Sequence, residues 1–196
     1  VTRFSSAPVD TTSTAAVVVP RARSTPSRPP RNGLVGAYGF DAGPGTTVAD
    51  ASGQDNHGTL SGAKWTTHGR YGGALSFDGA HGLVSVADAA SLDLSSGMTL
   101  EAWVYPTKLT GLHSAIVKEG SGGIVYALYG NDSAPRPSAY VRIEGQRLPG
   151  GSSGQMALEV NAWTHLAATY DGATLRLFVN GAETASHPVT GAIMPS

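Results

Sequence analysis

The acidic side chains that could serve as a catalytic pair are scattered along the chain. Hydrolysis of a glycosidic bond usually needs two carboxylates held roughly 5 to 10 Å apart. Glu101 is the only acid in its predicted strand, and Glu144 and Glu159 each stand alone in the sequence. Carboxylates from separate strands could still converge, but the sequence itself marks no catalytic residue, so we expect no enzyme activity from this chain.

Two further patterns resemble catalytic or metal-binding signatures but lack other features that such sites require. Residues 150–154 read Gly-Gly-Ser-Ser-Gly and match Gly-x-Ser-x-Gly. A nucleophile elbow needs a strand before the motif and a helix after it, whereas this run follows Pro149 in a predicted loop. His57 and His165 have no second histidine at ligand spacing, and zinc normally needs three or four nitrogen or sulfur ligands. We expect both histidines to be hydrogen-bonded structural residues.

The loop 50–58, Asp-Ala-Ser-Gly-Gln-Asp-Asn-His-Gly, offers oxygen ligands. Calcium takes six to eight oxygens from carboxylates and carbonyls on a bent loop, and this loop supplies two carboxylates, an amide, a hydroxyl and two glycines. Its spacing does not fit an EF-hand. The alternative is that Asp50 and Ser52 only form Asx and hydroxyl turns. Both interpretations remain open at the level of sequence.

The elements that must position these residues belong to a chain of 196 residues with a net charge of −1 and no cysteine. The charge argues against nucleic acid as a partner, because binding to phosphates needs a basic face. No apolar run approaches the roughly 18 residues of a membrane span, so we expect no membrane insertion. The lack of cysteine excludes disulfides and thiol nucleophiles, but it does not exclude secretion.

Composition divides the chain at about residue 32. Residues 1–32 contain no glycine, five prolines and five arginines against one acid, a net charge of +4. Residues 33–196 hold all 26 glycines and a net charge of −5. Because Ser, Thr, Pro and Arg offer little apolar surface to offset the entropy of ordering, we predict a flexible linker over 1–32 and one folded domain over 33–196.

The domain reads as short strands between glycine-rich turns. Asp78-Gly79, Asp171-Gly172 and Asn180-Gly181 favour tight hairpins, and no stretch has clean helical periodicity. This pattern predicts an all-β fold, an antiparallel two-sheet β-sandwich. The predicted strands cover residues 34–40, 74–77, 83–86, 98–105, 114–118, 124–129, 138–144, 163–170 and 174–179.

Alternation assigns a core face to two of these strands. In 98–105 the apolar face carries Leu100, Ala102 and Val104, and Trp103 and Tyr105 point the other way. In 174–179 the corresponding core residues are Leu175, Leu177 and Val179, with Phe178 on the opposite face. The aromatic side chains on the second face either form a stacking surface or pack under a loop.

Several motifs in a fixed order carry a resemblance to a known family. They are LVGAYGFD (34–41), VADASG (48–53), NHGTL (56–60), RYGGALSFDG (70–79), LVSV (83–86), MTLEAWV (98–104), WTHLAATYDG (163–172) and LRLFVNG (175–181). From about Gly33 onward the chain resembles the laminin-G-like jelly roll of the concanavalin A-like lectin and glucanase superfamily. Each motif is weak alone, whereas their combination is specific.

The resemblance implies a two-sheet jelly roll that commonly holds a structural calcium. Asp50 and Asn56 would be its main ligands here, with Asp78 as a further candidate. Family members continue into two further strands after the equivalent of residues 182–192, and we expect these to be missing here. The absence of a closing strand would leave residues 34–40 with an unpaired edge and lower the stability of the chain.

The resemblance also implies a role in glycan binding. We expect a non-catalytic carbohydrate-binding or glycan-adhesion module of a larger secreted multidomain protein, whose partners are a polysaccharide or cell-surface glycan and the other domains of its parent chain. The parent chain itself could be a glycoside hydrolase or lyase. The candidates for stacking on sugar rings are Trp103, Tyr105, Tyr126, Tyr129 and Tyr140. The alternatives are a structural spacer or protein-interaction domain without a sugar site, and an accessory domain of a glycoside hydrolase or lyase.

Overall fold

The computed structural model describes residues 2–5, 13–16, 33–146 and 150–196, with no account of the side chains of the first two segments. These residues form short strands and one 3-10 helix, η1 (Ala90–Leu92). The strands are β1 (Thr2–Ser5), β2 (Ser13–Ala16), β3 (Thr47–Val48), β4 (Gly58–Ser61), β5 (Lys64–Gly69), β6 (Gly72–Phe77), β7 (Leu83–Val86), β8 (Met98–Tyr105), β9 (His113–Gly120), β10 (Gly123–Asn131), β11 (Ser138–Val141), β12 (Gly150–Ser153), β13 (Thr164–Tyr170), β14 (Thr174–Val179) and β15 (Ala182–Pro188).

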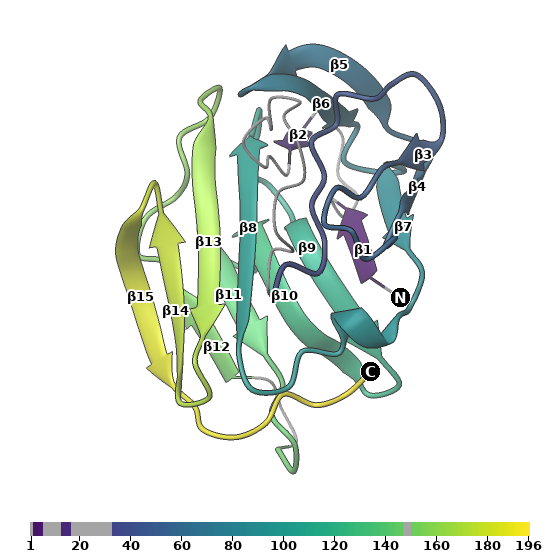
Figure 1. Cartoon of the computed structure of the whole chain (residues 1–196). Helices are drawn as coiled ribbons and strands as arrows, with labels where there is room; N and C mark the ends of the chain where they lie inside the picture. Colours follow the sequence, from purple (N-terminus) through teal and green to yellow (C-terminus); the bar gives the residue numbers. More distant parts are fainter. Residues whose placement is uncertain (1, 6–12, 17–32, 147–149) are drawn as a thin grey trace.

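The strands form two sheets that face each other across one core (Figure 1). Sheet A has the order β12-β11-β10-β9-β1-β7-β4-β3, and sheet B has the order β15-β14-β13-β8-β2-β6-β5. All strand pairs are antiparallel, and β10 and β11 contact β8, β13 and β14 of the opposite sheet. The antiparallel two-sheet β-sandwich predicted from the turn pattern is therefore confirmed.

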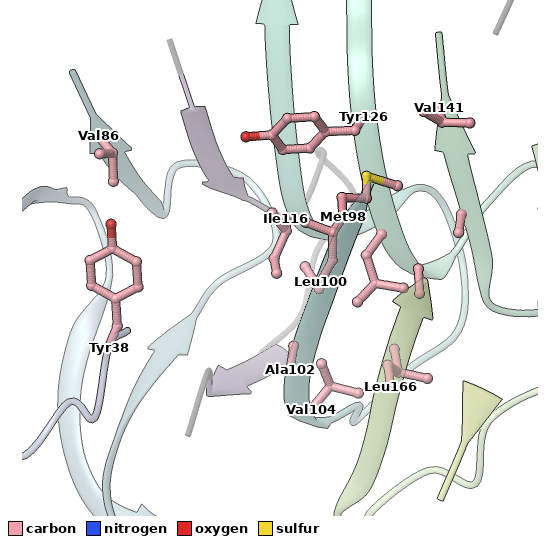
Figure 2. Packing of buried hydrophobic residues seen from close by; sticks show 14 of the residues in the cluster. Tyr38, Val86, Met98, Leu100, Ala102, Val104, Ile116, Tyr126, Val141 and Leu166 are labelled. Atoms are coloured by element: carbon pink, nitrogen blue, oxygen red, sulfur yellow. The ribbon is translucent and has the colours of Figure 1, made fainter. Parts of the chain in front are cut away.

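The core lies between the sheets and is built by the alternation of each strand. On β8, Leu100, Ala102 and Val104 are buried and point toward Ile116 and Tyr126 of sheet A (Figure 2). The predicted core face of β8 is thus confirmed, and on β14 Leu175 and Leu177 are fully buried, whereas Val179 is half-buried and packs against the core. Burying such side chains contributes about 1.5–3 kcal/mol each, which is why one face of every central strand is apolar.

Two strands come from the segment predicted as a linker. β1 lies between β7 and β9 in sheet A, and β2 lies between β6 and β8 in sheet B, each antiparallel to both neighbours. The low apolar content of residues 1–32 gave no signal for these strands, because a strand inside a sheet is held by backbone hydrogen bonds that any sequence can form. The rest of the predicted linker, residues 1, 6–12 and 17–32, lies outside the described residues.

The segment 34–40 is not a strand, contrary to the prediction. Phe40 has a φ of 54°, which interrupts an extended conformation, and the segment packs on the sandwich through the buried rings of Tyr38 and Phe40. Its backbone is held at Ala37, whose carbonyl accepts a hydrogen bond from Ala51 at 2.7 Å. After residue 33, five strands were not predicted: β3, β4, β5, β12 and β15. The outer strands β5, β12 and β15 lack an alternating apolar pattern.

Candidate functional site

Four side chains meet on the face of sheet B that is turned away from the core. The Arg70 guanidinium carbon lies 5.0 Å from the ring centroid of Trp103 and 5.1 Å from that of Tyr71. The two aromatic rings contact each other edge to face at 5.6 Å, and the imidazole of His165 lies 5.2 Å from the indole. We call Arg70, Tyr71, Trp103 and His165 the outer cluster.

The strand register explains why these residues meet. Trp103 on β8 is the direct partner of His165 on β13, so both side chains leave the sheet at the same place. Arg70 and Tyr71 form the turn of the β5–β6 hairpin, flanked by Gly69 and Gly72. The hairpin therefore carries a cation and a phenol ring over the indole.

The outer cluster combines an exposed ring with a charged group. Tyr71 is the most exposed tyrosine, tryptophan or phenylalanine of the described residues, at 52% of its full surface, and Arg70 is also exposed. Trp103 is half-buried, since the guanidinium covers part of its ring. Cation–π contacts of this kind contribute about 0.5–1 kcal/mol at exposed sites, which holds the Arg70 side chain in place. The surface open to a ligand is therefore formed by Tyr71 and Arg70, with Trp103 as their support.

A second aromatic pair lies along the same face. Tyr105 follows two residues after Trp103 on β8, and its ring lies 5.5 Å from that of Trp163, the residue before β13. Both rings are half-buried, and Trp163 also packs against the core. Two of the predicted stacking residues, Trp103 and Tyr105, thus lie on one exposed sheet face.

The other three predicted stacking residues lie in sheet A. Tyr126 is only 3% exposed, belongs to the core and donates a hydrogen bond to the carbonyl of Leu92 at 3.0 Å, so it is not available for stacking on a ligand. Tyr129 and Tyr140 lie on the outer face of sheet A, with their rings edge to face at 5.8 Å. The structure therefore divides the five predicted residues between two outer faces and the core.

Tyr129 and Tyr140 are held in an internal network. Tyr129 is buried, and this burial raises the pKa of its phenol to about 12. Tyr140 is half-buried and donates a hydrogen bond to the Asp132 carboxylate; burial, and then this bond, raise the pKa of Tyr140. Ser138 Oγ donates to the same Asp132 Oδ2 at 2.9 Å. The hydroxyl of Tyr140 is thus engaged within the protein, and the ring of Tyr129 is buried.

The carboxylate of Asp50 organises the loop that the sequence suggested for calcium. Its Oδ1 accepts hydrogen bonds from the backbone N–H groups of Ala37 and Ser52, both at 2.8 Å. Its Oδ2 accepts from Ser52 Oγ at 2.6 Å and from the backbone N–H of Asn56 at 3.1 Å. The backbone N–H of Asp50 donates to Nδ1 of His57 at 3.0 Å. These are the Asx and hydroxyl turns that the sequence left open as an alternative to a metal.

The other two predicted calcium ligands are also engaged. Asn56 is 6% exposed, and its Nδ2 donates to the carbonyl of Val35 at 2.6 Å and to Ser91 Oγ at 2.9 Å. Asp78 lies in the β6–β7 loop, where Oδ1 accepts from the backbone N–H groups of Ala80 and His81, both at 2.8 Å. The backbone N–H of His81, then that of Ala80, and then the His81 imidazole hold the pKa of Asp78 well below its usual range.

The donor set around these residues does not fit a bound cation. Both oxygens of Asp50 face hydrogen-bond donors, whereas calcium needs oxygen lone pairs directed at one point. Among the described residues no three His, Asp or Glu side chains gather as a metal-binding group. Calcium therefore stays a prediction from the resemblance, and Asp50 has a structural role that does not depend on it.

The Gly-x-Ser-x-Gly run and the histidines can now be placed. Residues 150–153 form strand β12 at the edge of sheet A, rather than the predicted loop, and no helix follows them among the described residues. His57 accepts the Asp50 hydrogen bond, as a structural histidine does. His165 differs, because its Nε2 lies 4.0 Å from Glu101 Oε2 within the outer cluster.

A family model supports the fold at the level of sequence. The model described as the concanavalin A-like lectin/glucanases superfamily, laminin-G type, matches residues 78–196, which is more than half of the chain. This chain belongs to that superfamily. The match includes Trp103, Tyr105 and His165 of sheet B, whereas Arg70 and Tyr71 of the β5–β6 turn lie before its first residue.

Three solved structures are similar to this chain to different extents. The binding domain of Paraclostridial Mosquitocidal Protein 1 is similar with a TM-score of 0.59 at 14% identity, over 74% of this chain and 39% of that one. Domain 4 of AbnA, an extracellular GH43 arabinanase from Geobacillus stearothermophilus solved with arabinotriose, has a TM-score of 0.49 at 20% identity. The match covers 75% of this chain and 72% of that one. A putative carbohydrate-binding protein from Bacteroides ovatus has a TM-score of 0.40 at 13% identity. The match covers 100% of this chain and 65% of that one. The first likeness supports the superfamily fold alone.

Two other comparisons give negative results. No curated protein matches this member of the superfamily. Within the two N-terminal strands and residues 33–146 and 150–196, no helix has the length and apolar character needed to cross a membrane.

Sequence reasoning missed two residues of the outer cluster and did not connect a third, His165, with Trp103. Arg70 and Tyr71 lie in a turn more than thirty positions before Trp103, and only the strand order brings them together. The Arg-Tyr pair between glycines was a weak signal that a turn exposes an aromatic ring. His165 could have been placed beside Trp103 by pairing the two strands in the register that buries both apolar faces.

Proposed function

We propose that this chain is a non-catalytic carbohydrate-binding module that binds its glycan at the outer cluster. The observation that carries the proposal is the exposed ring of Tyr71 beside the fixed guanidinium of Arg70, both supported by Trp103. Aromatic faces pack against the C–H groups of sugar rings, and the five N–H donors of an arginine suit sugar hydroxyls. Membership of the lectin and glucanase superfamily agrees with this assignment.

The neighbouring residues extend this surface along β8. Glu101 and Tyr105 flank Trp103 on the same strand face, and Trp163 packs against Tyr105. Glu101 is exposed and can accept hydrogen bonds from hydroxyl groups. A glycan lying along β8 would contact an exposed ring first and polar side chains next, which is the usual make-up of a ligand site. We further propose that the module belongs to a larger secreted protein.

The experiment compares retention on polysaccharides. A panel of soluble polysaccharides is tested by affinity electrophoresis, and insoluble ones by pull-down, with the full chain and its Tyr71→Ala variant. We expect at least one polysaccharide to retard the wild type and Tyr71→Ala to bind it about tenfold more weakly, a loss of about 1.4 kcal/mol. Met156→Ala removes another exposed apolar side chain outside the cluster and should change nothing.

The same samples test the absence of catalysis. Polysaccharide incubated with the wild type should release no reducing ends, because Glu101 is a single carboxylate beside the cluster and hydrolysis usually needs two. Release that disappears in Glu101→Gln would contradict a non-catalytic role. Failure to bind any polysaccharide would contradict the proposal and favour a structural spacer.

A further inference from the structure

Arg70 differs from the other charged side chains that the structure pairs. Arg176 on β14 lies 2.6 Å from Asp171 and 3.9 Å from Glu183, and buried Lys118 is paired with Asp88. Arg70 contacts two aromatic rings, and within the described part of the chain no carboxylate forms an ion pair with it. Its charge is therefore available at the surface.

The nearby carboxylates are engaged elsewhere. Glu101, on the same face as Trp103, is directed to His165, with 4.0 Å between Oε2 and Nε2. Asp41 lies beside the β5–β6 hairpin, where its Oδ1 accepts a hydrogen bond from the backbone N–H of Gly73 at 2.8 Å. Neither carboxylate neutralises the guanidinium of Arg70.

The N–H donors of the Arg70 guanidinium are not used by the described part of the protein. Its central carbon lies 5.0 Å from the Trp103 ring and 5.1 Å from the Tyr71 ring, and no carboxylate or carbonyl of the described residues is bound to the group. A guanidinium held in this way presents a fork of parallel donors, which matches the two oxygens of a carboxylate. The Tyr71 ring beside it supplies an apolar surface for the sugar ring that carries the carboxylate.

We propose that the outer cluster recognises an acidic polysaccharide through the carboxylate of a uronic acid residue. Arg70 binds the carboxylate through two N–H groups, and Tyr71 packs against the same sugar. This inference rests on the proposed function, since it names the ligand class of the same site. A neutral glycan would offer Arg70 hydroxyl oxygens only, whereas a carboxylate offers two charged oxygens to the same donors.

The test uses two ligands that differ only at C6 of each sugar, where one has a carboxylate and the other a hydroxymethyl group. Oligogalacturonate and the neutral oligogalactan made from it by carboxyl reduction are titrated into the full chain by calorimetry. We expect the wild type to bind the acidic form at least tenfold more tightly, and the preference to weaken as salt is raised. Arg70→Gln should abolish the preference, and Arg70→Lys should keep only part of it, because a lysine offers no planar fork.

A matched arginine serves as the control. Arg176→Gln removes a positive charge from the same sheet, but this arginine already has carboxylate partners, so the preference should be unchanged. Equal affinity of the wild type for both ligands, or a preference that survives in Arg70→Gln, would overturn this inference and leave the proposed function standing. Failure to bind either ligand or any polysaccharide of the panel would overturn both.

Discussion

The ammonium group of Lys118 donates a hydrogen bond to the carboxylate of Asp88, although the lysine side chain has no exposed surface and the aspartate side chain is half-exposed. Asp93 lies 3.7 Å from the same ammonium and accepts a hydrogen bond from Ser196 Oγ at 2.6 Å. Strand β9 is thereby tied to the segment around η1 and to the last described residue. A buried charge of this kind is tolerated only because carboxylates neutralise it.

We expect substitution of Asp88 and substitution of Lys118 to lower the stability by different amounts. Removing one partner of a fully buried pair costs about 3–5 kcal/mol, and we expect about 2 kcal/mol for Asp88→Asn because Asp93 remains near the ammonium. Lys118→Met removes the charge and keeps the volume, so it should destabilise less. Urea unfolding of both variants measures the difference. A Lys118→Met variant less stable than Asp88→Asn would contradict this view of the pair.

Stability should fall in acid. The hydrogen bond from Lys118 holds the pKa of Asp88 below its usual value, and Arg176, then two backbone N–H groups, lower that of Asp171 to about 2. Since these pKa values are lower in the folded state, their contribution is present above about pH 4 and is lost as pH falls toward 2. Urea unfolding from pH 6 to 2 measures the loss. Asp171→Asn should make the free energy of unfolding depend less steeply on pH. An unchanged dependence would contradict a contribution from Asp171.

Two glycines with similar backbones test the packing of the β4–β5 connection. Gly62 has a φ of +68° and Gly181 a φ of +81°, so alanine is strained at both by about 1–2 kcal/mol. A Cβ at Gly62 would also overlap the carbonyl of His81, whereas the space around Gly181 is open. We expect Gly62→Ala to cost about 3 kcal/mol, the larger loss of the two. Equal losses in thermal unfolding would show that the His81 loop adjusts freely.

The loop that contains Asp50 and Asn56 gives a prediction that separates hydrogen bonding from metal binding. Asn56→Ala should destabilise the chain by about 2 kcal/mol, because it leaves the Val35 carbonyl without its donor. The exposed Gln54→Ala is the control. Asp50→Ala should lower the melting temperature by the same amount with calcium and with a chelator. A calcium-induced rise that Asp50→Ala removes would instead establish the predicted metal site.

The alternation of apolar residues predicted the central strands and their core faces. The other strands depend on pairing with segments far away in the sequence. β8 and β14 alternate cleanly because one face of each is buried, so Leu100 and Leu177 could be assigned to the core. The segment 34–40 has the same apolar character but forms no strand, and β1 and β2 lie between the neighbouring strands of the two sheets instead. The β1 and β2 strands carry no apolar pattern and depend on neighbours far away in the sequence.

The candidate site was likewise predicted in part from local pattern and depends in part on contacts between distant segments. Trp103 and Tyr105 were predicted to leave the core face, which the alternation of β8 determines. Tyr126 lies on the same face of β10 as Leu128, so the alternation of this strand places its ring in the core, which was not predicted. The contact of Arg70 with Trp103 depends on how a hairpin folds over the sheet, which no spacing in the sequence reveals.

The three tryptophans offer the most direct test of the site. Trp103 lies in the outer cluster, Trp163 packs against Tyr105, and Trp65 donates its indole N–H to the Gly45 carbonyl at 2.7 Å. The chain labelled with nitrogen-15 in tryptophan gives one indole signal from each, followed by NMR while a polysaccharide fragment identified by affinity electrophoresis is added. We predict that the Trp103 signal shifts in proportion to binding and that the Trp65 signal stays in place. Binding that shifts the Trp65 signal and leaves Trp103 unchanged would contradict a glycan site at the outer cluster.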